Sequence, residues 1–420
     1  MDGKRFLRTL RLTNFLSFGE EGAEIPLEPL NVLIGLNASG KSNLIEAIRL
    51  LQATPRDLLE PIRQGGGVGE WLWKGAKSTP VAEISVVVEY PDDLMIPLRY
   101  QLCFTQETQR FSLVDEAIIR EHGPYPDPEI ERILSEDDKP DYLYSFQQGA
   151  PVISVREVDA PKEGHTLGSG VSRVSRQLGR GSLALNLSVL AQIRDREHYP
   201  EITYLGDQFG KIKVFQEWNL GRYTAPRMPQ KVDLPDDFLE PDASNLGLVL
   251  NNLQHQPGVE KQILSNLREF YEAFDHVTIR IQGGTVQVFV HERGLNQPVP
   301  ATRLSDGTLR YLCLLTILCH PDPPPLICIE EPELGLHPDI LPTIAELMID
   351  ASQRTQLIVT THSEVLVSAL TEVPEAVIVC ERNNAGTHLR RLERKALEDW
   401  LKDYSLGELW RMGEIGGNRW

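Results

Sequence analysis

The pattern of apolar and polar positions switches between short strand-like runs and helical periodicity. Three runs, at 31–34, 326–329 and 356–360, are almost unbroken apolar segments. Runs of this length are typical of strands that are buried on both faces of a sheet. Alternating patterns indicate further strands at 6–12, 24–27, 82–90 and 98–104. We therefore expect an α/β fold with a mixed sheet, whose first strands form a small antiparallel meander.

The middle of the chain has a different pattern. Helical periodicity appears at 182–193, 245–253 and 258–274, and a hairpin pattern with two turn glycines follows at 277–290. We interpret 156–275 as an inserted, mainly helical lobe. The strand-rich segments on either side, 1–155 and 276–420, would then form one discontinuous domain.

The stretch from Gly35 to Ser42 reads G-x-x-x-x-G-K-S and lies between an apolar run and a predicted helix that ends before Pro55. A glycine-rich loop in this position wraps a phosphate chain with backbone N–H groups at a helix N-terminus. We expect Lys41 to reach the β- and γ-phosphates and Ser42 to bind Mg²⁺, so the cofactors would be Mg²⁺ and ATP or GTP. The residues expected around the nucleotide are Gly35, Asn37, Ala38, Ser39, Gly40, Lys41, Ser42 and Asn43.

Two acidic residues, Glu330 and Glu331, directly follow the apolar run 326–329. In an open α/β sheet the ligand lies outside the carboxyl ends of the parallel strands, where the glycine-rich loop also lies. We expect Glu330 to hold Mg²⁺ through water, and Glu331 to be the base that orients or activates the attacking water. Gln101, near the end of the strand at 98–104, is a further candidate for sensing Mg²⁺ and the γ-phosphate.

Two more segments bring polar groups to the expected site. The run 356–360 leads to His362, which we expect to contact the γ-phosphate or the attacking water. It follows the acidic pair by one predicted helix, as in a right-handed crossover between parallel strands. Ser305 and Gly307 precede a helix at 309–319 that is apolar nearly all round. Its N-terminus is either a second anion-binding point or a helix cap without further function.

The charge distribution limits contacts with nucleic acid. The 42 basic and 60 acidic residues give a formal net charge of −18, which argues against a broad nucleic-acid-binding surface but allows a confined one. Between 160 and 231, eleven lysines and arginines stand against six acids, so the local balance is +5. This segment is either a solvated surface or a contact face for DNA or an acidic partner.

The cysteines and the apolar segments indicate the cellular setting. The five cysteines are dispersed, mostly within apolar runs, and have no metal-binding spacing, so we expect buried thiols in a reducing compartment. The longest apolar segment, at 311–319, is less than half of the ~20 residues that span a bilayer, and the N-terminus has no signal-peptide core. We expect a cytoplasmic protein without a membrane role.

In order and spacing, five segments resemble the ABC-type ATPase heads of the SMC/RecF superfamily: 35–42, 304–308, 326–332, 333–337 and 360–362. The resemblance implies a P-loop NTPase fold of the ABC/SMC-head type. It also implies a shared site, because in that family a Ser-Gly-Gly loop of one subunit contacts the γ-phosphate held by the other. Here the loop reads Ser305-Asp306-Gly307, so that an aspartate takes the place of a glycine.

The motifs at 304–310, 330–338 and 360–363 are more closely similar to those of stand-alone bacterial ATPases with an AAA_21-type domain. Members of that branch often accompany a separate nuclease or TOPRIM-like protein in defence or repair operons. The chain lacks the long heptad arms of SMC proteins, and too few residues follow His362 for the TOPRIM domain of OLD-like relatives. We therefore expect a head with a compact lobe and no nuclease of its own.

The leading hypothesis is an ATP-hydrolysing switch that acts in DNA repair or anti-phage defence together with a separate nuclease or effector. Two copies would close head to tail around two Mg-ATP, with Ser305 of one subunit completing the site of the other. The competing hypothesis is a regulatory scaffold whose ATP-bound state sequesters an effector. A P-loop kinase is a third class, but it would leave the segment 304–308 and His362 unexplained.

Overall fold

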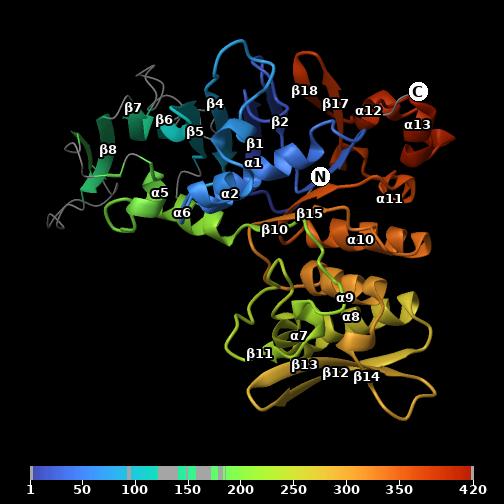
Figure 1. Cartoon of the computed structure of the whole chain (residues 1–420). Coiled ribbons are helices and arrows are strands. Elements are labelled where there is room, and N and C mark those ends of the chain that lie inside the picture. Colours follow the sequence, from blue (N-terminus) through green and yellow to red (C-terminus); the bar gives the residue numbers. More distant parts are fainter. Residues whose placement is uncertain are drawn as a thin grey trace, which may run out of the picture.

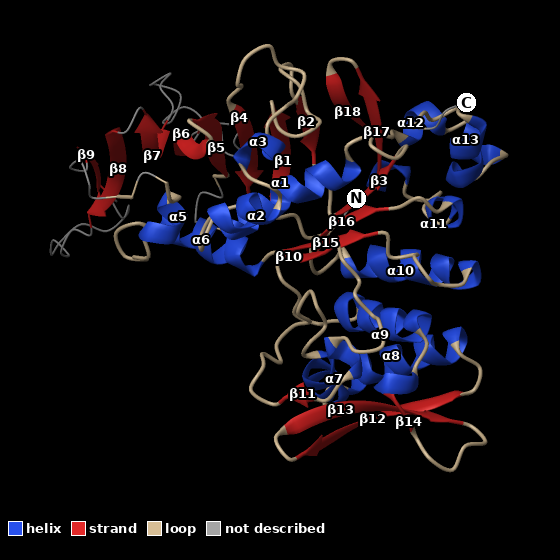
Figure 2. Ribbon diagram, in the orientation of Figure 1, coloured by secondary structure: helices blue, strands red, loops and turns tan. Residues whose placement is uncertain are grey.

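The computed structural model describes residues 3–91, 96–121, 141–147, 150–157, 172–177, 183–184 and 186–417. Within these ranges the strands form three sheets, and helices lie between them (Figures 1 and 2). The antiparallel sheet lies at the upper left of Figure 1, the central sheet runs through the middle, and the third sheet lies at the bottom.

The antiparallel sheet has eight strands in the described residues, in the order β2-β1-β4-β5-β6-β7-β8-β9. Its strands are β1 (Leu7–Thr13), β2 (Ala23–Pro26), β4 (Ala82–Val88), β5 (Leu98–Glu107), β6 (Arg110–Arg120), β7 (Asp141–Gln147), β8 (Ala150–Glu157) and β9 (Ser172–Gln177). The strands expected from alternating patterns are confirmed. The expected meander is wrong in one respect, because β3 (Leu30–Ile34) leaves this sheet and pairs in parallel with two strands of the central one.

The central sheet has six strands in the described residues, in the order β10-β15-β16-β3-β17-β18. β10 (Lys213–Phe215), β15 (Leu326–Glu330), β16 (Gln356–Thr360), β3 and β17 (Val377–Asn383) run parallel, and β18 (Gly386–Arg391) is antiparallel to β17. The carboxyl ends of the parallel strands therefore lie along one edge.

Side chains of the parallel strands alternate between two cores. Leu33 and Ile358 join a core shared with the antiparallel sheet and with α1 (Lys41–Ala53). Val32 and Val359, their neighbours in sequence, join the core on the opposite face. Burial on both faces is the physical reason for the unbroken apolar runs in the sequence.

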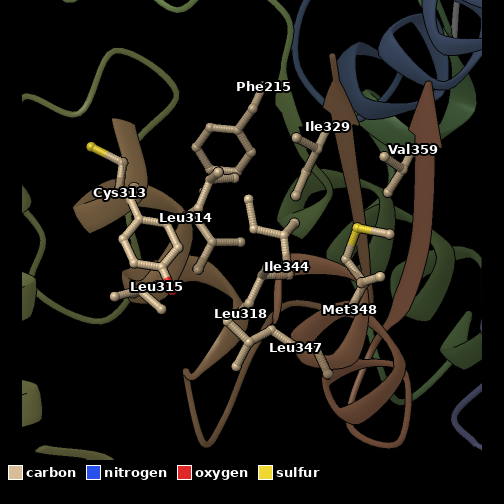
Figure 3. Packing of buried hydrophobic residues seen from close by; sticks show 14 of the residues in the cluster. Phe215, Cys313, Leu314, Leu315, Leu318, Ile329, Ile344, Leu347, Met348 and Val359 are labelled. Atoms are coloured by element: carbon tan, nitrogen blue, oxygen red, sulfur yellow. The ribbon is translucent and has the colours of Figure 1, made fainter. Parts of the chain in front are cut away.

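Two helices cover the second face of the central sheet, α10 (Leu341–Ala351) and, beyond it, α9 (Asp306–Leu318). In Figure 3, Leu318 of α9 and Ile344 of α10 lie in the same apolar cluster as Ile329 of β15. The helix that was expected to be apolar nearly all round is thus confirmed as a buried one.

The third sheet contains the expected hairpin, formed by β12 (Phe274–Gln282) and β13 (Thr285–Glu292). β11 (Gln230–Lys231) and β14 (Val299–Pro300) also pair with β13. The helices α7 (Leu246–Gln254) and α8 (Pro257–Phe270) pack between this hairpin and α9. The remaining helices of the described residues are α2 (Leu59–Gln64), α3 (Val68–Trp71), α5 (Val189–Gln192), α6 (Pro200–Lys211), α11 (Glu364–Ser368), α12 (Arg394–Leu397) and α13 (Leu406–Met412). The short 3₁₀ turns there are η1 (Ala225–Arg227), η2 (Ala301–Arg303), η3 (Pro338–Ile340), η4 (Pro374–Ala376) and η5 (Trp400–Lys402).

Residues 156–275, expected as one inserted lobe, contribute to three parts of the molecule. β9 extends the antiparallel sheet, α6 packs on α1, β10 joins the central sheet, and α7 and α8 pack against the third sheet. The helix expected at 182–193 is only the short α5, because Ser188 has extended backbone and caps the helix by accepting a hydrogen bond from the N–H of Leu190. The division into domains at 156 and 275 stays a prediction.

Two described cations of the segment 160–231, Lys213 and Arg227, have local roles. Lys213 Nζ lies 2.9 Å from a carboxylate oxygen of Glu240, and Arg227 is buried. Lys162 and Arg180, expected on the same face, lie outside the described residues. A contact face for DNA or an acidic partner at 160–231 stays a prediction.

The remaining expectations about the chain as a whole concern cysteines and membranes. All five cysteines are buried free thiols, as expected. None of the described helices is both long enough and apolar enough to cross a membrane.

A buried carboxylate, Glu116 on β6, connects the antiparallel sheet to α5. It accepts hydrogen bonds from the hydroxyls of Tyr100 at 2.7 Å and Ser188 at 2.5 Å, and from the N–H of Val189 at 2.8 Å. Burial raises the pKa of Glu116 to about 7, although these three hydrogen bonds lower it. The folded protein therefore holds a proton here that the unfolded chain releases at lower pH.

We predict that Glu116→Gln makes stability less dependent on pH. Between an unfolded pKa of 4.5 and a folded pKa of about 7 the folded state binds the extra proton, so the wild-type free energy of unfolding falls as pH rises through this window. The fall amounts to on the order of 3 kcal/mol. Melting temperatures from about pH 5 to about pH 8 should fall more steeply in the wild type than in the variant. Glu107→Gln, at an exposed position of the same sheet, is the control, and equal slopes for wild type and Glu116→Gln would contradict the prediction.

Candidate active site at the edge of the central sheet

The glycine-rich loop joins β3 to α1 and depends on its glycines. Gly35 has a φ of 147°, and a Cβ there would lie 2.2 Å from the carbonyl oxygen of Cys380. Gly40 has a φ of 108° and leaves no room beside Thr387, whose Oγ1 would be 2.4 Å from a Cβ. Gly40 also caps α1 without a side chain, so the first N–H groups of α1 remain available to an anion.

Lys41 is folded back over this loop. Its Nζ donates to the carbonyl oxygens of Gly35 and Leu36, both at 2.9 Å, and the residue is 6% exposed. Burial lowers the pKa of Lys41, whereas Glu330 and Glu331 are among the groups that raise it. A phosphate chain in the loop would offer this ammonium stronger acceptors than two neutral carbonyls.

Glu330 ends β15 and faces α1. Its carboxylate accepts a hydrogen bond from the Ser42 hydroxyl, and its Oε1 is buried without a partner in the described structure. Burial raises the pKa of Glu330; the Ser42 hydrogen bond opposes this rise and the Glu331 carboxylate adds to it. A hydroxyl beside a carboxylate with an unpartnered oxygen suits Mg²⁺, which is usually held by one or two protein oxygens, water and substrate phosphates. The described residues contain no cluster of three or more His, Cys, Asp or Glu side chains that could hold a metal ion.

Glu331 has a left-handed backbone with a φ of 45°, which costs on the order of 1 kcal/mol in a residue with a side chain. Its N–H donates to the Thr360 carbonyl at 3.0 Å, and its own carbonyl accepts from Arg310 at 3.3 Å. Its Oε1 lies 3.5 Å from Nε2 of His362. The strained backbone thus turns the Glu331 carboxylate toward the end of the neighbouring strand.

His362 is fixed by a residue that the sequence reasoning missed, Glu333. Glu333 Oε1 accepts from the backbone N–H of His362 and from the hydroxyl of Thr361, both at 2.8 Å. Burial and the nearby Lys41 ammonium lower the pKa of His362, which favours the neutral imidazole. A neutral imidazole accepts a hydrogen bond at one nitrogen and donates one at the other.

Ser305 and Gly307 begin α9, as expected. The Ser305 hydroxyl caps the helix, because it accepts from the Thr308 N–H at 3.0 Å. A Cβ on Gly307 would lie 2.7 Å from the carbonyl oxygen of Gly335, so the start of α9 packs tightly on the loop that follows the acidic pair. Ser305 itself is exposed.

Gln101 lies within β5 of the antiparallel sheet, and its side chain donates to Glu83 at 3.1 Å. Gln216, and not Gln101, lies at the end of a strand beside the acidic pair, where the residue that senses Mg²⁺ is expected. It follows β10 directly, and Phe215 of β10 lies opposite Ile329 of β15, so Gln216 and Glu330 leave the central sheet side by side.

The surroundings of Gln216 support this comparison. Its Nε2 donates to Glu46 Oε1 at 3.0 Å, and Glu46 is one of the carboxylates that act on Glu330. Gln216, Glu46 and Asn43 line one cavity of about 770 Å³. The geometry therefore favours Gln216 over Gln101 as the residue that senses the metal and the γ-phosphate. Its sequence signal is weak, because the preceding strand has only three residues.

Comparison with known proteins gives one family. Residues 30–368 match the AAA_21 family, described as "AAA domain, putative AbiEii toxin, Type IV TA system". The matched range begins at β3 and ends with α11, so it contains every segment of the candidate site described above. No curated protein matches the sequence.

Solved SMC head domains share the fold. An SMC head bound to the C-winged helix domain of ScpA superposes with a TM-score of 0.55 and 13% identity, over 94% of this chain and 100% of that one. An SMC head with an extended coiled coil, bound to the C-terminal domain of ScpA and derived from Pyrococcus furiosus, gives a TM-score of 0.52 and 12% identity, over 95% and 99% of the two chains. These similarities confirm the expected fold class.

We predict that Gln216→Ala lowers the turnover of ATP by about 10- to 100-fold, because one positioned group near a transferring phosphoryl group contributes on that order. Nucleotide affinity should change little, since Lys41 and the loop remain. Steady-state ATPase rates and binding of a fluorescent ATP analogue measure the two effects. Gln101→Ala is the matched control. The assignment fails if Gln101→Ala slows turnover and Gln216→Ala does not.

Proposed function

The chain belongs to the AAA_21 family of ATPases and has the SMC-head fold, and from this starting point we propose that it is a Mg-dependent, ATP-driven dimerisation switch. Two copies would close head to tail around two Mg-ATP, and hydrolysis would reopen them. Such switches generally have two conformational states, and contacts to the γ-phosphate hold the protein in one of them.

The observation that carries this proposal is the exposed hydroxyl of Ser305, whose hydrogen bonds in the described structure go to Thr308 and not to the other expected groups. Five of these groups come from neighbouring elements at one edge of the central sheet: Lys41, Ser42, Glu330, Glu331 and His362. Ser305 is exposed at the start of α9 and uses its hydroxyl in the cap of its own helix. A second copy, docked head to tail, would present this helix N-terminus to the γ-phosphate.

Two exposed apolar side chains next to the site support the proposal that a second copy covers this face. Leu36 in the glycine-rich loop is 41% exposed, and Leu334 in the loop after the acidic pair is 49% exposed. Apolar groups that flank a polar site are typical of surfaces that a partner covers. Leu334 lies in the same loop as Gly335, on which Gly307 packs, so this covered face would be continuous with the start of α9.

Each residue then has a role in hydrolysis. Lys41 would move from the loop carbonyls to the β- and γ-phosphates, and Ser42 and Glu330 would hold Mg²⁺, which neutralises charge on the phosphates. Glu331 would orient water for attack on the γ-phosphorus, so that the bond to the β,γ-bridging oxygen breaks and ADP and phosphate form. His362, held by Glu333, would donate a hydrogen bond to the γ-phosphate or the water.

The biological setting we propose is DNA repair or anti-phage defence together with a separately encoded nuclease or TOPRIM-like effector. It rests on the motif resemblance and on the family match. The alternative is a regulatory scaffold that sequesters its effector while ATP is bound. The local ion pairs in the segment 160–231 favour a confined DNA contact, if DNA binds, over a broad one.

We predict that Glu331→Gln forms a stable dimer in the presence of Mg-ATP and hydrolyses ATP at least about 100-fold more slowly than the wild type, because the group that orients the water is lost. Size-exclusion chromatography with light scattering, with and without ATP, tests assembly. Lys41→Ala in the Glu331→Gln background is the control and should remain monomeric. Glu331→Gln that stays monomeric with ATP, or that turns over normally, would overturn the proposal.

The two settings differ in their response to DNA. For a DNA-acting switch we expect the ATPase rate to rise several-fold with double- or single-stranded DNA, because DNA favours one of the two states. For a scaffold we expect no response to DNA and co-purification of a neighbouring gene product. ATPase rates of the wild type, measured with and without DNA, separate the DNA-acting switch from the scaffold. Glu331→Gln gives the background rate as a control.

A further inference from the structure

A buried arginine, Arg227 of η1, holds the backbone that precedes α9. Its side chain is 4% exposed. Its Nη1 donates to the carbonyl oxygens of Ala301 at 3.1 Å and Leu304 at 2.6 Å, and its Nε donates to the carbonyl of Leu220 at 2.7 Å. A guanidinium offers five N–H groups in a rigid fork, so one side chain fixes three carbonyls in two stretches of backbone.

The charge of Arg227 is balanced by Asp306. Arg227 Nη2 is paired with a carboxylate oxygen of Asp306, whose side chain is 74% exposed. The carbonyl partners are neutral, so Asp306 is the anion that offsets this buried cation. Asp306 is also the residue that replaces a glycine of the related signature loops, and the ion pair gives this replacement a physical reason.

Ser305 lies between the two anchored points. On one side the Leu304 carbonyl accepts from Arg227, and on the other side the Asp306 carboxylate is paired with the same guanidinium. A change in the backbone at 304–306 would disturb these contacts, and the Ser305 hydroxyl is itself bonded to the Thr308 N–H. A hydroxyl that is held in place loses less conformational freedom when it binds a phosphate.

We propose that Arg227 and Asp306 are a positioning pair that aims Ser305 at the γ-phosphate held by the partner subunit. This inference rests on the proposed dimer. The pair also has an electrostatic role, because an unpaired carboxylate beside Ser305 would repel the triphosphate, whereas a carboxylate engaged by a guanidinium does so less. Neither residue touches the reacting atoms; both act through Ser305.

The test uses Asp306, because its exposed side chain allows substitution without opening the core. Asp306→Asn keeps the shape and removes the charge, and we expect kcat to fall about 10-fold with KM within about twofold of the wild type, since groups of the same subunit bind ATP. Asp306→Glu should restore at least half of the wild-type kcat. Asp399→Asn, at an exposed carboxylate whose Oδ1 lies 2.7 Å from Lys402 Nζ, is the matched control and should be unaffected. Because Asp306→Asn leaves the buried Arg227 without its carboxylate, its melting temperature should fall, so kcat is compared well below the melting temperatures of all variants.

A double-mutant cycle tests the pair itself. Arg227→Lys keeps a cation but loses the fork, and we expect a fall in kcat similar to that of Asp306→Asn. The double variant Arg227→Lys/Asp306→Asn should be no slower than the slower single variant, because both changes remove the same interaction. The inference would be overturned if the two single-variant losses in kcat multiply in the double variant, or if the Asp306→Asn enzyme keeps the wild-type kcat.

Assembly separates this inference from the proposed function. Glu331→Gln that fails to dimerise with ATP overturns both. Glu331→Gln that dimerises, while Asp306→Asn turns over normally, overturns only the positioning pair. In the Glu331→Gln background, Asp306→Asn should raise the ATP concentration needed for half-maximal dimer by about 10-fold, and an unchanged concentration would contradict the pair.

Discussion

The whole site depends on the burial of the central sheet on both faces. Because side chains alternate along a strand, Leu33 and Val32 serve two different cores, and the same holds for Ile358 and Val359. No polar side chain fits in the middle of such strands without a partner, so the chemistry is confined to their carboxyl ends. The parallel register places Glu330 next to Thr360, and the residues that follow these two strands therefore meet.

The charged groups at that edge have partners before any ligand arrives. Lys41 is nearly buried, yet it has carbonyl partners and lies within the field of Glu330 and Glu331. The carboxylates in turn lie near the Lys41 ammonium and the His362 imidazole, and not only near each other. A site arranged in this way needs little reorganisation when the phosphates of a nucleotide replace the loop carbonyls, and such preorganisation is a large part of how enzymes stabilise charged transition states.

Local sequence patterns predicted the parts of the site that are contiguous in the chain. The glycine-rich loop, the acidic pair and the strand that leads to His362 each have their spacing and their apolar run within about ten residues. Gln216 and Arg227 lack such a signal, whereas Glu333 lies in the motif at 330–338, which gives it no role of its own. Gln216 follows a strand of three residues that exists only because it pairs with β15, and Arg227 is defined by backbone carbonyls from two distant segments. Gln101 was chosen because it lies on a long, clear strand, but that strand belongs to the antiparallel sheet.

In the proposed dimer, the helix α9 would connect the two halves of a shared site within one subunit. Its first turn carries Ser305 and Asp306, and Arg310 about one turn later donates to the carbonyl of Glu331 and lies over the ring of Trp218, 5.2 Å from the ring centre. Trp218 donates in turn to the carbonyl of Glu330 at 3.1 Å. A single buried helix moves as a rigid body, because its packed side chains resist local deformation. In the proposed dimer, a contact that displaces the start of α9 would also act on the backbone of Glu331, whose carbonyl accepts from Arg310. This physical link would tie events at one nucleotide to the geometry of the acid that serves the other.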